Sequence, residues 1–204
     1  MKLSTIYIVD GFFNNMSKTL IIHTRSSSLL PKAVYSKELK KNIFEHGRQK
    51  DLSENLVVLE DKVSDEIINL WSLEKKDLDK LKVQYEFSKV THSSTSFIKS
   101  CLDKSKDGIY FNKINTGIEV LVITSDNVQL YNSLFGSENQ DLLYYILLYQ
   151  ERYGKELKIY VSSIFDKEAL KLLKEYIADV KTITVAVKTI IESQVPHYTV
   201  LKCE

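Results

Sequence analysis

The sequence predicts a mixed α/β fold, and three features of its second half carry this prediction. Two apolar segments rich in β-branched residues, Ile118–Thr124 and Val128–Phe135, flank the turn residues Ser125-Asp126-Asn127, which is typical of a β-hairpin. A helix is predicted from Ser137 to Gly154, and a further strand over Leu157–Ser163. A hairpin followed by alternating helices and strands indicates a sheet with both antiparallel and parallel pairs.

The composition is that of a globular protein of one or two domains. The chain has 204 residues, of which 44% are hydrophobic and 27% charged, so it can bury a sizeable core. We predict two domains, an N-terminal subdomain over residues 1–107 and a C-terminal subdomain over residues 108–204. The 28 Lys and Arg residues nearly balance the 27 Asp and Glu residues, so net charge does not favour binding to nucleic acid or an anionic membrane.

Cysteine usage and the N-terminal segment predict a cytoplasmic protein. Cys101 and Cys203 are far apart and form no metal-binding or redox pair, which suits a reducing compartment. The apolar segment Leu3–Val9 is too short and too polar for a signal peptide. The longest apolar run, Leu142–Tyr149, is far shorter than the ~20 residues that span a bilayer, so no membrane partner is expected.

The first half is predicted to contain short strands and helices joined by polar loops. Asp10–Ser17 and Ser26–Leu30 are expected to be loops, because both are rich in small polar residues. Ser36 can cap a helix that runs through Arg48. The other elements follow in order: strands over Leu3–Val9, Thr19–Thr24, Asn55–Glu60 and Glu66–Trp71, a helix over Glu74–Leu81, a strand over Gln84–Val90, and a helix around Phe97–Leu102 that Gly108 closes.

The second half adds further elements around the hairpin. The helix from Ser137 begins with a capping box, because Gln140 follows Ser137 at the required spacing. This helix is apolar nearly all round, so we expect it to be covered on two sides. The remaining elements are a strand over Ile109–Ile114 with a turn at Asn115-Thr116-Gly117, a helix from Asp166 through Ala178, a strand over Val180–Val187, and an edge strand over Tyr198–Cys203. A meander followed by alternating helices and parallel strands is the plan of the ribonuclease-H-like half of actin-type proteins.

Several segments resemble a bacterial family of unknown function. The strongest are Val128–Phe135 and Asp141–Leu147, which are similar to the family pattern L-x-N-S-F … D-x-x-Y-Y-x-L. Further similar segments follow the same order along the chain: Leu30–Tyr35, Thr91-His92-Ser93, Lys174–Ile177, Pro196-His197-Tyr198 and Cys203-Glu204. The resemblance implies an actin-like ATPase fold, with two related α/β subdomains facing a cleft, and it implies no activity. The segment before Leu30 looks short for the family, so the first subdomain is expected to be abbreviated.

The turns that would bind phosphate in an actin-type ATPase lack the expected glycines. Such turns hold phosphate on backbone amides, and glycine is needed where the backbone approaches the ligand closely. In the second half the matching turn, Ser125-Asp126-Asn127, has no glycine, and in the first half Asp10-Gly11 is followed by Phe12-Phe13. The chain also has no Walker-type loop and no Gly-x-Gly-x-x-Gly motif. ATP hydrolysis is therefore not predicted.

The segment Thr91–Ser96 is the best local candidate for an anion site. His92 and the surrounding hydroxyl groups lie where a predicted helix begins, and a helix N-terminus presents free amides and a positive dipole. The alternative, which we favour, is that Thr91 or Ser93 simply caps that helix. The four histidines never fall at the spacing of metal ligands on a helix, so no metal site is expected.

The predicted helix over residues 36–48 is basic. Its positive residues, together with one shortly after it, are Lys37, Lys40, Lys41, Arg48 and Lys50. Acidic residues interrupt the run, so a solvated face is favoured over a site for a polyanion.

These observations leave three functional hypotheses and assign no catalytic residue. The leading one is a non-catalytic binding or scaffolding protein of the bacterial cytoplasm, without a cofactor, whose partner is another protein or a second copy of the chain. The second is a nucleotide-dependent switch that binds Mg-ATP in the cleft. Its phosphate-binding residues would be Asp10, Gly11, Asp126 and Asn127, with His92 near the cleft. The third is a nucleic-acid-associated module that uses the basic helix over residues 37–50. Whether the protein is an enzyme stays open, with the balance against it.

Overall fold

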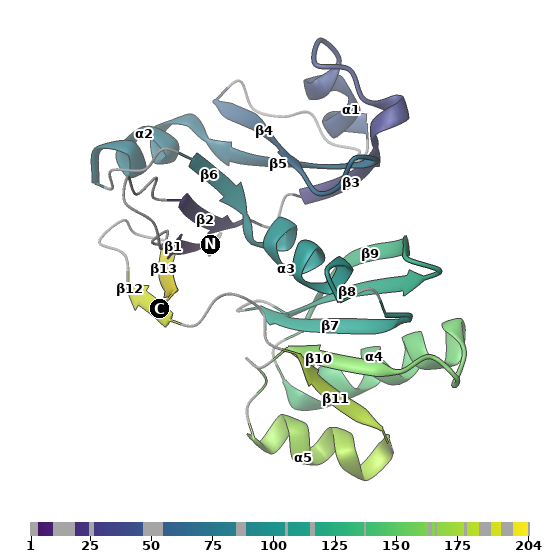
Figure 1. The fold of residues 1–204 in the computed structure, drawn as a ribbon. Coiled ribbons are helices and arrows are strands. Elements are labelled where there is room, and N and C mark those ends of the chain that lie inside the picture. Colours follow the sequence, from purple (N-terminus) through teal and green to yellow (C-terminus); the bar gives the residue numbers. More distant parts are fainter. Residues whose placement is uncertain are drawn as a thin grey trace. The chain divides into compact units, whose positions relative to one another are not determined.

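The computed structural model describes residues 4–9, 19–24, 27–46, 55–84, 89–104, 106–114, 117–136, 138–162, 165, 167–177, 179–183, 189–192 and 198–203. The chain divides into two compact units, Met1–Ser96 with Val187–Glu204, and Phe97–Ala186 (Figure 1). The division differs from the predicted boundary after residue 107 in two ways. It falls inside a helix, and the C-terminal residues return to the first unit because their strands join its sheet.

The second unit is built on one five-stranded sheet. Its strands are β7 (Gly108–Ile114), β8 (Gly117–Thr124), β9 (Asn127–Phe135), β10 (Ile159–Ser162) and β11 (Val180–Ile183). They lie in the order β11-β10-β7-β8-β9 (Figure 1). Strands β7, β8 and β9 form an antiparallel meander, while β10 pairs parallel with β7 and β11 pairs parallel with β10. This topology confirms the predicted ribonuclease-H-like plan of the second half.

Two helices cover one face of this sheet, α4 (Asn139–Tyr153) and α5 (Lys167–Tyr176). Alternation along the strands places one set of apolar side chains on the helix-covered face. The buried core comprises Ile109, Phe111, Ile118, Val120, Val122, Leu142, Ile146, Tyr149, Ile159, Val161, Phe165, Ala169, Leu173 and Ile177. Since each buried apolar side chain contributes about 1.5–3 kcal/mol, this core is the main source of stability of the second unit.

Helix α4 departs from the prediction at its surface and at its start. It buries a single stripe, Leu142, Ile146 and Tyr149, whereas Tyr144 is 62% exposed, so the expected cover on two sides is wrong within this chain. The N-cap of the helix is Glu138, which makes no side-chain cap hydrogen bond, and Ser137, on which the predicted capping box depends, lies outside the described residues. The helix ends at Gly154 as predicted, with a φ of 109° that favours glycine.

The opposite face of the same sheet carries Tyr110, Asn112 and Glu119, which alternate with the core residues. Helix α3 (Ser93–Leu102) brings Cys101 close to Tyr110 and Glu119. Burial raises the pKa of the Cys101 thiol well above its usual range, so it does not form a reactive thiolate near neutral pH. Helix α3 ends at Leu102, so the expectation that Gly108 closes it is wrong: Gly108 is the first residue of β7.

The first unit has a main sheet drawn from both ends of the chain. Its strands are β1 (Ser4–Val9), β2 (Thr19–His23), β6 (Lys89–His92), β12 (Thr189–Glu192) and β13 (Tyr198–Cys203). Their order is β12-β13-β1-β2-β6 (Figure 1). The segment predicted as an edge strand is therefore interior, because β13 pairs with both β1 and β12. Among the described residues this sheet has five strands, as does the sheet of the second unit, and the abbreviation of the first subdomain stays a prediction.

A second, antiparallel sheet of the first unit lies between β2 and β6 in the sequence. It is formed by β3 (Ser27–Pro31), β5 (Ile67–Glu74) and β4 (Leu56–Lys62), in that order. The predicted loop over Ser26–Leu30 is wrong, because β5 supplies the pairing that makes β3 a strand. Three short helices accompany these strands: η1 (Lys32–Val34), α1 (Lys40–His46) and α2 (Lys75–Gln84). Across the ranges described above, no helix is both long and apolar enough to cross a membrane.

Candidate functional site

A cluster of polar side chains is buried in the first unit, where β2, β4, β5 and β6 approach the start of α3. Its members come from strands and from the first turn of the helix, and less than a tenth of each is exposed: His23, Thr24, Asp61, Asn69, Thr91, His92, Ser93, Ser94 and Thr95. Burying a polar group costs free energy unless it is hydrogen-bonded. The cluster therefore has to be explained by its hydrogen bonds or by a ligand.

Asp61, from β4, lies at the N-terminus of α3. Its Oδ2 atom accepts three hydrogen bonds, from Thr91 Oγ1 (2.8 Å), from the His92 backbone N–H (2.7 Å) and from Thr95 Oγ1 (2.8 Å). Burial raises the pKa of the Asp61 carboxyl above its ordinary value, and these three hydrogen bonds oppose that shift. A carboxylate is also favoured next to the positive end of the helix dipole. Asp61 thus occupies the position where an external anion would bind.

His92 is the N-cap of α3. Its Nδ1 atom accepts a hydrogen bond from the Ser94 backbone N–H (3.2 Å), in the second position of the helix. Its Nε2 atom lies 2.9 Å from the Thr24 amide nitrogen and 3.1 Å from the Thr24 carbonyl oxygen. The fully buried ring also lies 5.4 Å from the rings of His23 and Trp71. His92 therefore has a structural role, and the predicted cap is corrected from Thr91 or Ser93 to His92.

The hydroxyl groups of the first turn of α3 are also engaged inside the cluster. Ser93 Oγ lies 2.8 Å from His23 Nδ1, and Asn69 Nδ2 donates to Thr95 Oγ1 (2.9 Å). A Ser-His pair needs a third group to orient the imidazole in acyl-transfer enzymes. Asp61 does not supply it, because none of its three hydrogen bonds comes from an imidazole. The arrangement therefore does not favour nucleophilic catalysis.

Among the described residues, Asn69 Oδ1 of the cluster and Nε1 of the neighbouring Trp71 are buried atoms with no hydrogen-bond partner in the protein. Both side chains are fully buried, and their positions two residues apart on β5 place them on one face of that strand. Asn69 Oδ1 can accept a further hydrogen bond, and Trp71 Nε1 can donate one.

The hairpin turn of the second unit does not resemble a phosphate-binding loop. Ser125 and Asp126 have positive φ values of 52° and 61°, as two-residue hairpin loops require. The Ser125 N–H donates to Asp107 Oδ1 (2.7 Å), and Asn127 Nδ2 donates to the Ser125 carbonyl oxygen (2.8 Å). An amide that phosphate would need is therefore already bound to a carboxylate.

This turn also lies at the end of the sheet away from the usual ligand position. Ligands of open α/β sheets bind beyond the carboxyl ends of the parallel strands. The register pairs Gly108, at the amino end of β7, with Ile123 of β8, so the turn is near that amino end. Residues 115–116, at the carboxyl end of β7, lie outside the described part of the chain.

The nucleotide site predicted from five residues stays a prediction, because two of them are not described and the other three belong to different units. Asp10 and Gly11 fall outside the described ranges. His92 is buried in the first unit, and Asp126 and Asn127 belong to the exposed turn of the second. No group of three or more His, Cys, Asp or Glu side chains among the described residues could hold a metal ion.

A second buried polar cluster lies in the second unit and was missed from the sequence. Glu119, fully buried on β8, accepts hydrogen bonds from Asn112 Nδ2 (2.7 Å, to Oε2) and from Tyr131 Oη (2.8 Å, to Oε1). The available signal was a single acidic residue inside the apolar strand Gly117–Thr124. Because Glu119 and Asn112 are paired directly across β7 and β8, this cluster ties the two central strands together.

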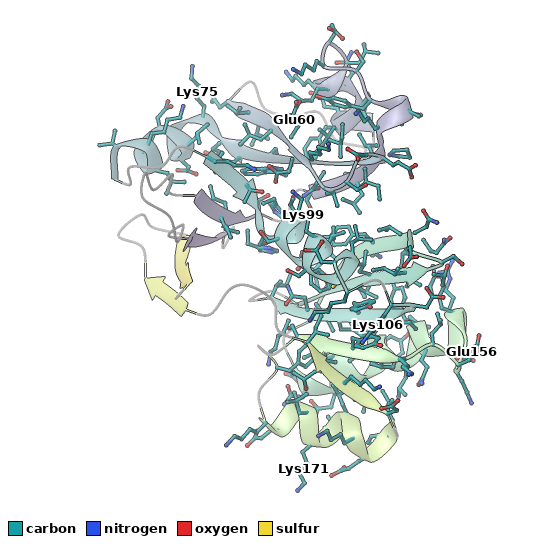
Figure 2. All side chains as sticks on the ribbon, viewed as in Figure 1. Glu60, Lys75, Lys99, Lys106, Glu156 and Lys171 are labelled. Carbon is teal, nitrogen blue, oxygen red and sulfur yellow. The ribbon has the colours of Figure 1, made fainter. Side chains whose placement is uncertain are left out.

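The basic helix offers little free positive charge. Lys40 lies 3.5 Å from Glu60 of β4, which is labelled in Figure 2, and Lys41 lies 3.8 Å from Glu45 on the same helix. Arg48 and Lys50 lie outside the described residues. Ion pairs with neighbouring carboxylates reduce the field that would attract a nucleic acid.

Comparison with known proteins identifies a family and a fold. A family model described as "Protein of unknown function (DUF3822)" matches residues 16–180. Among solved structures, the chain is similar to a protein of Bacteroides thetaiotaomicron VPI-5482 with an actin-like ATPase fold and unknown function. The TM-score is 0.70 at 16% sequence identity, over 89% of this chain and 91% of that chain. No curated protein matches the chain. At this identity the likeness establishes the actin-like ATPase fold and carries nothing about activity.

Proposed function

The chain belongs to the family of proteins of unknown function DUF3822, and from that premise and its actin-like ATPase fold we propose that it is a non-catalytic binding or scaffolding protein. We place it in the bacterial cytoplasm, with a protein as its partner. The proposal requires that the nucleotide chemistry associated with the fold is lost in this chain.

One observation carries this proposal: both candidate anion sites among the described residues are filled by carboxylates of the chain itself. Asp61 occupies the N-terminus of α3, and Asp107 binds the Ser125 amide of the hairpin turn. A phosphate placed ~4 Å from such a carboxylate meets a repulsion of about 1 kcal/mol per charge pair in water and about 4 kcal/mol near a protein surface. The attraction of a helix N-terminus is typically only ~0.3–1 kcal/mol, so repulsion outweighs it.

The test is a thermal-unfolding scan with and without millimolar Mg-ATP. Ligand at a hundredfold excess over its dissociation constant stabilises the folded state by ~2.7 kcal/mol, which a scan detects easily. We expect no shift of the unfolding midpoint, and no release of phosphate above that of an Asp126→Ala variant. An upward shift that Asp126→Ala abolishes would refute the proposal and favour the nucleotide switch. An Asp107→Asn variant is the matched control, because it removes the competing charge and keeps an acceptor for the Ser125 amide.

A further inference from the structure

Helix α4 carries an outward row of side chains that is distinct from its buried stripe. The row is Asp141, Tyr145, Leu148 and Arg152, at successive spacings of four, three and four residues. This spacing keeps the four side chains on one side of a helix with 3.6 residues per turn, and it is the spacing of a two-helix seam. Asp141 and Arg152 are exposed, Leu148 is 42% exposed, and Tyr145 is half-buried.

The row has the same pattern when it is read from either end: a charged residue stands at each end, the two charges are opposite, and the two residues between them are Tyr145 and Leu148. If two such helices pack antiparallel about a two-fold axis, Asp141 of each faces Arg152 of the other, and Tyr145 faces Leu148. We propose that this face of α4 is the contact between two copies of the chain in a homodimer. A two-fold contact uses the same patch on both partners, so the patch must be complementary to itself, as this row is.

Among the described residues of one chain, the two charges of the row form no ion pair. Neither Asp141 nor Arg152 forms an ion pair with any other described residue; Arg152 lies over the Tyr153 ring at 5.7 Å. Facing opposite charges contribute mostly to specificity and orientation, and like charges in the same place are costly. The row therefore favours a second copy in the antiparallel orientation over an unrelated partner, for which no such symmetry would be required.

The strand next to α4 supports the same contact. Tyr145 Oη donates to the Phe135 carbonyl oxygen (2.9 Å), so the row passes the end of β9, where the Phe135 side chain is 58% exposed. β9 is the edge strand of its sheet, and its nine residues include no charged residue and no proline. The opposite edge, β11, has four residues and an exposed Lys181, which are ordinary protections against strand pairing. Of the two edges of this sheet as described, the one beside α4 therefore lacks these protections.

The dimer does not depend on the proposed function, because it rests on α4 and β9 alone. It is tested on the full chain by sedimentation velocity at about 1–100 µM, a range that detects dimers with dissociation constants up to the micromolar range. We expect the wild type to sediment with twice the mass of one chain. Asp141→Arg and Arg152→Asp should each be monomeric, because each places like charges opposite one another across the axis.

Two combinations then test the geometry itself. An equimolar mixture of the two single variants should form a heterodimer, since each introduced charge then faces its opposite in the other chain. The double variant Asp141→Arg with Arg152→Asp should form a homodimer again. Both rescues require the antiparallel pairing of these two positions, and a general loss of solubility or folding would produce neither.

The matched controls change the same charges on α5 of the same unit. Glu168→Arg alters an exposed acidic residue in the first turn of its helix, as Asp141→Arg does in α4, and Lys171→Asp parallels Arg152→Asp. Both controls should remain dimeric. A monomeric wild type over the whole concentration range would overturn the inference, and so would a dimer that survives both single reversals on α4.

Discussion

Replacing Asp61 with alanine should strongly destabilise the first unit. The substitution removes the acceptor of three hydrogen bonds from Thr91, Thr95 and the His92 amide. The hydroxyl groups can turn toward other partners, but the buried His92 N–H cannot, and leaving it unpaired costs ~1–3 kcal/mol. Each hydrogen bond from a hydroxyl group to the charged carboxylate contributes ~1.5–3 kcal/mol, and part of that contribution is lost as well. The expected total loss in the free energy of unfolding is about 3–5 kcal/mol.

Asp61→Asn separates the hydrogen bonds from the charge. The amide oxygen can still accept from the three donors, so we expect a loss below ~1.5 kcal/mol at neutral pH. The pH dependence has a definite sign, because the folded pKa of Asp61 is raised above the ordinary value of 3.8 by burial. Between these two pKa values the folded state binds more protons than the unfolded state, so stability falls as pH rises. The wild type should therefore lose its advantage over Asp61→Asn as pH rises from 3.8 through the folded pKa.

Trp71 provides the assay. It is the only tryptophan of the chain, it is fully buried, and its ring lies 5.4 Å from that of His92, so its fluorescence reports on this cluster. Urea unfolding followed at this residue between pH 4 and 8 gives the free energies of the wild type and both variants. An advantage of the wild type over Asp61→Asn that grows with pH would refute the reasoning, because the hydrogen bonds would then outweigh burial. A loss below ~1 kcal/mol in Asp61→Ala would show that the His92 amide finds another partner.

Two further predictions concern the second unit and are measured by urea unfolding followed by circular dichroism. Glu119→Ala should lower the free energy of unfolding by ~3 kcal/mol or more, since Asn112 and Tyr131 lose their buried acceptor. Tyr131→Phe should lower it by ~1–1.5 kcal/mol. Fully additive effects in the double variant would contradict the hydrogen bond between Tyr131 and Glu119. Gly117→Ala should cost more than ~3 kcal/mol, because the new Cβ would lie 1.9 Å from the Leu134 carbonyl oxygen at a φ of 155°, and a near-neutral effect would exclude this close approach.

The second half of the fold was predictable from sequence because its signals are local. The hairpin over Ile118–Phe135 has alternating apolar strands and a turn of Ser and Asp, and the helix before Gly154 has a regular apolar spacing. Each of these features is decided within about ten residues. The strands β8 and β9 and the end of α4 agree with the prediction to within one residue.

The features that were missed depend on partners far along the chain. β3 is a strand only because β5, about 40 residues later, pairs with it, and its own small polar residues indicate a loop. β13 is interior because it inserts beside β1 from the other end of the chain. Neither local composition nor periodicity carries information about such pairings. The prediction that α4 is covered on two sides was wrong for the same reason, because the sequence of the helix does not show which other elements pack against it.

The candidate site was located correctly but interpreted with the wrong partner. The hydroxyl-rich segment from Thr91 does open a helix, as predicted, and its N-terminus does hold an anion. That anion is the carboxylate of Asp61, which lies 30 residues earlier in the chain. In the sequence Asp61 simply follows Glu60 within a strand, and nothing there distinguishes the two acidic residues. A sequence can indicate that a helix N-terminus is available, but it cannot show which distant group occupies it.

The buried cluster at the start of α3 and the row on α4 differ in whether their polar groups are already paired within the chain. A site built for an external ligand keeps donors or charges whose partners are missing until the ligand arrives. At the start of α3 the Ser94 amide, the His92 amide and the hydroxyl of Thr95 are all bound within the chain, so these three groups contribute to stability and are not available to a phosphate. The row on α4 differs, because its two charges form no ion pair with the described residues of their own chain. By this argument we propose that the recognition surface lies on α4, and the charge-reversal pairs at Asp141 and Arg152 test it more directly than any substitution in the buried clusters.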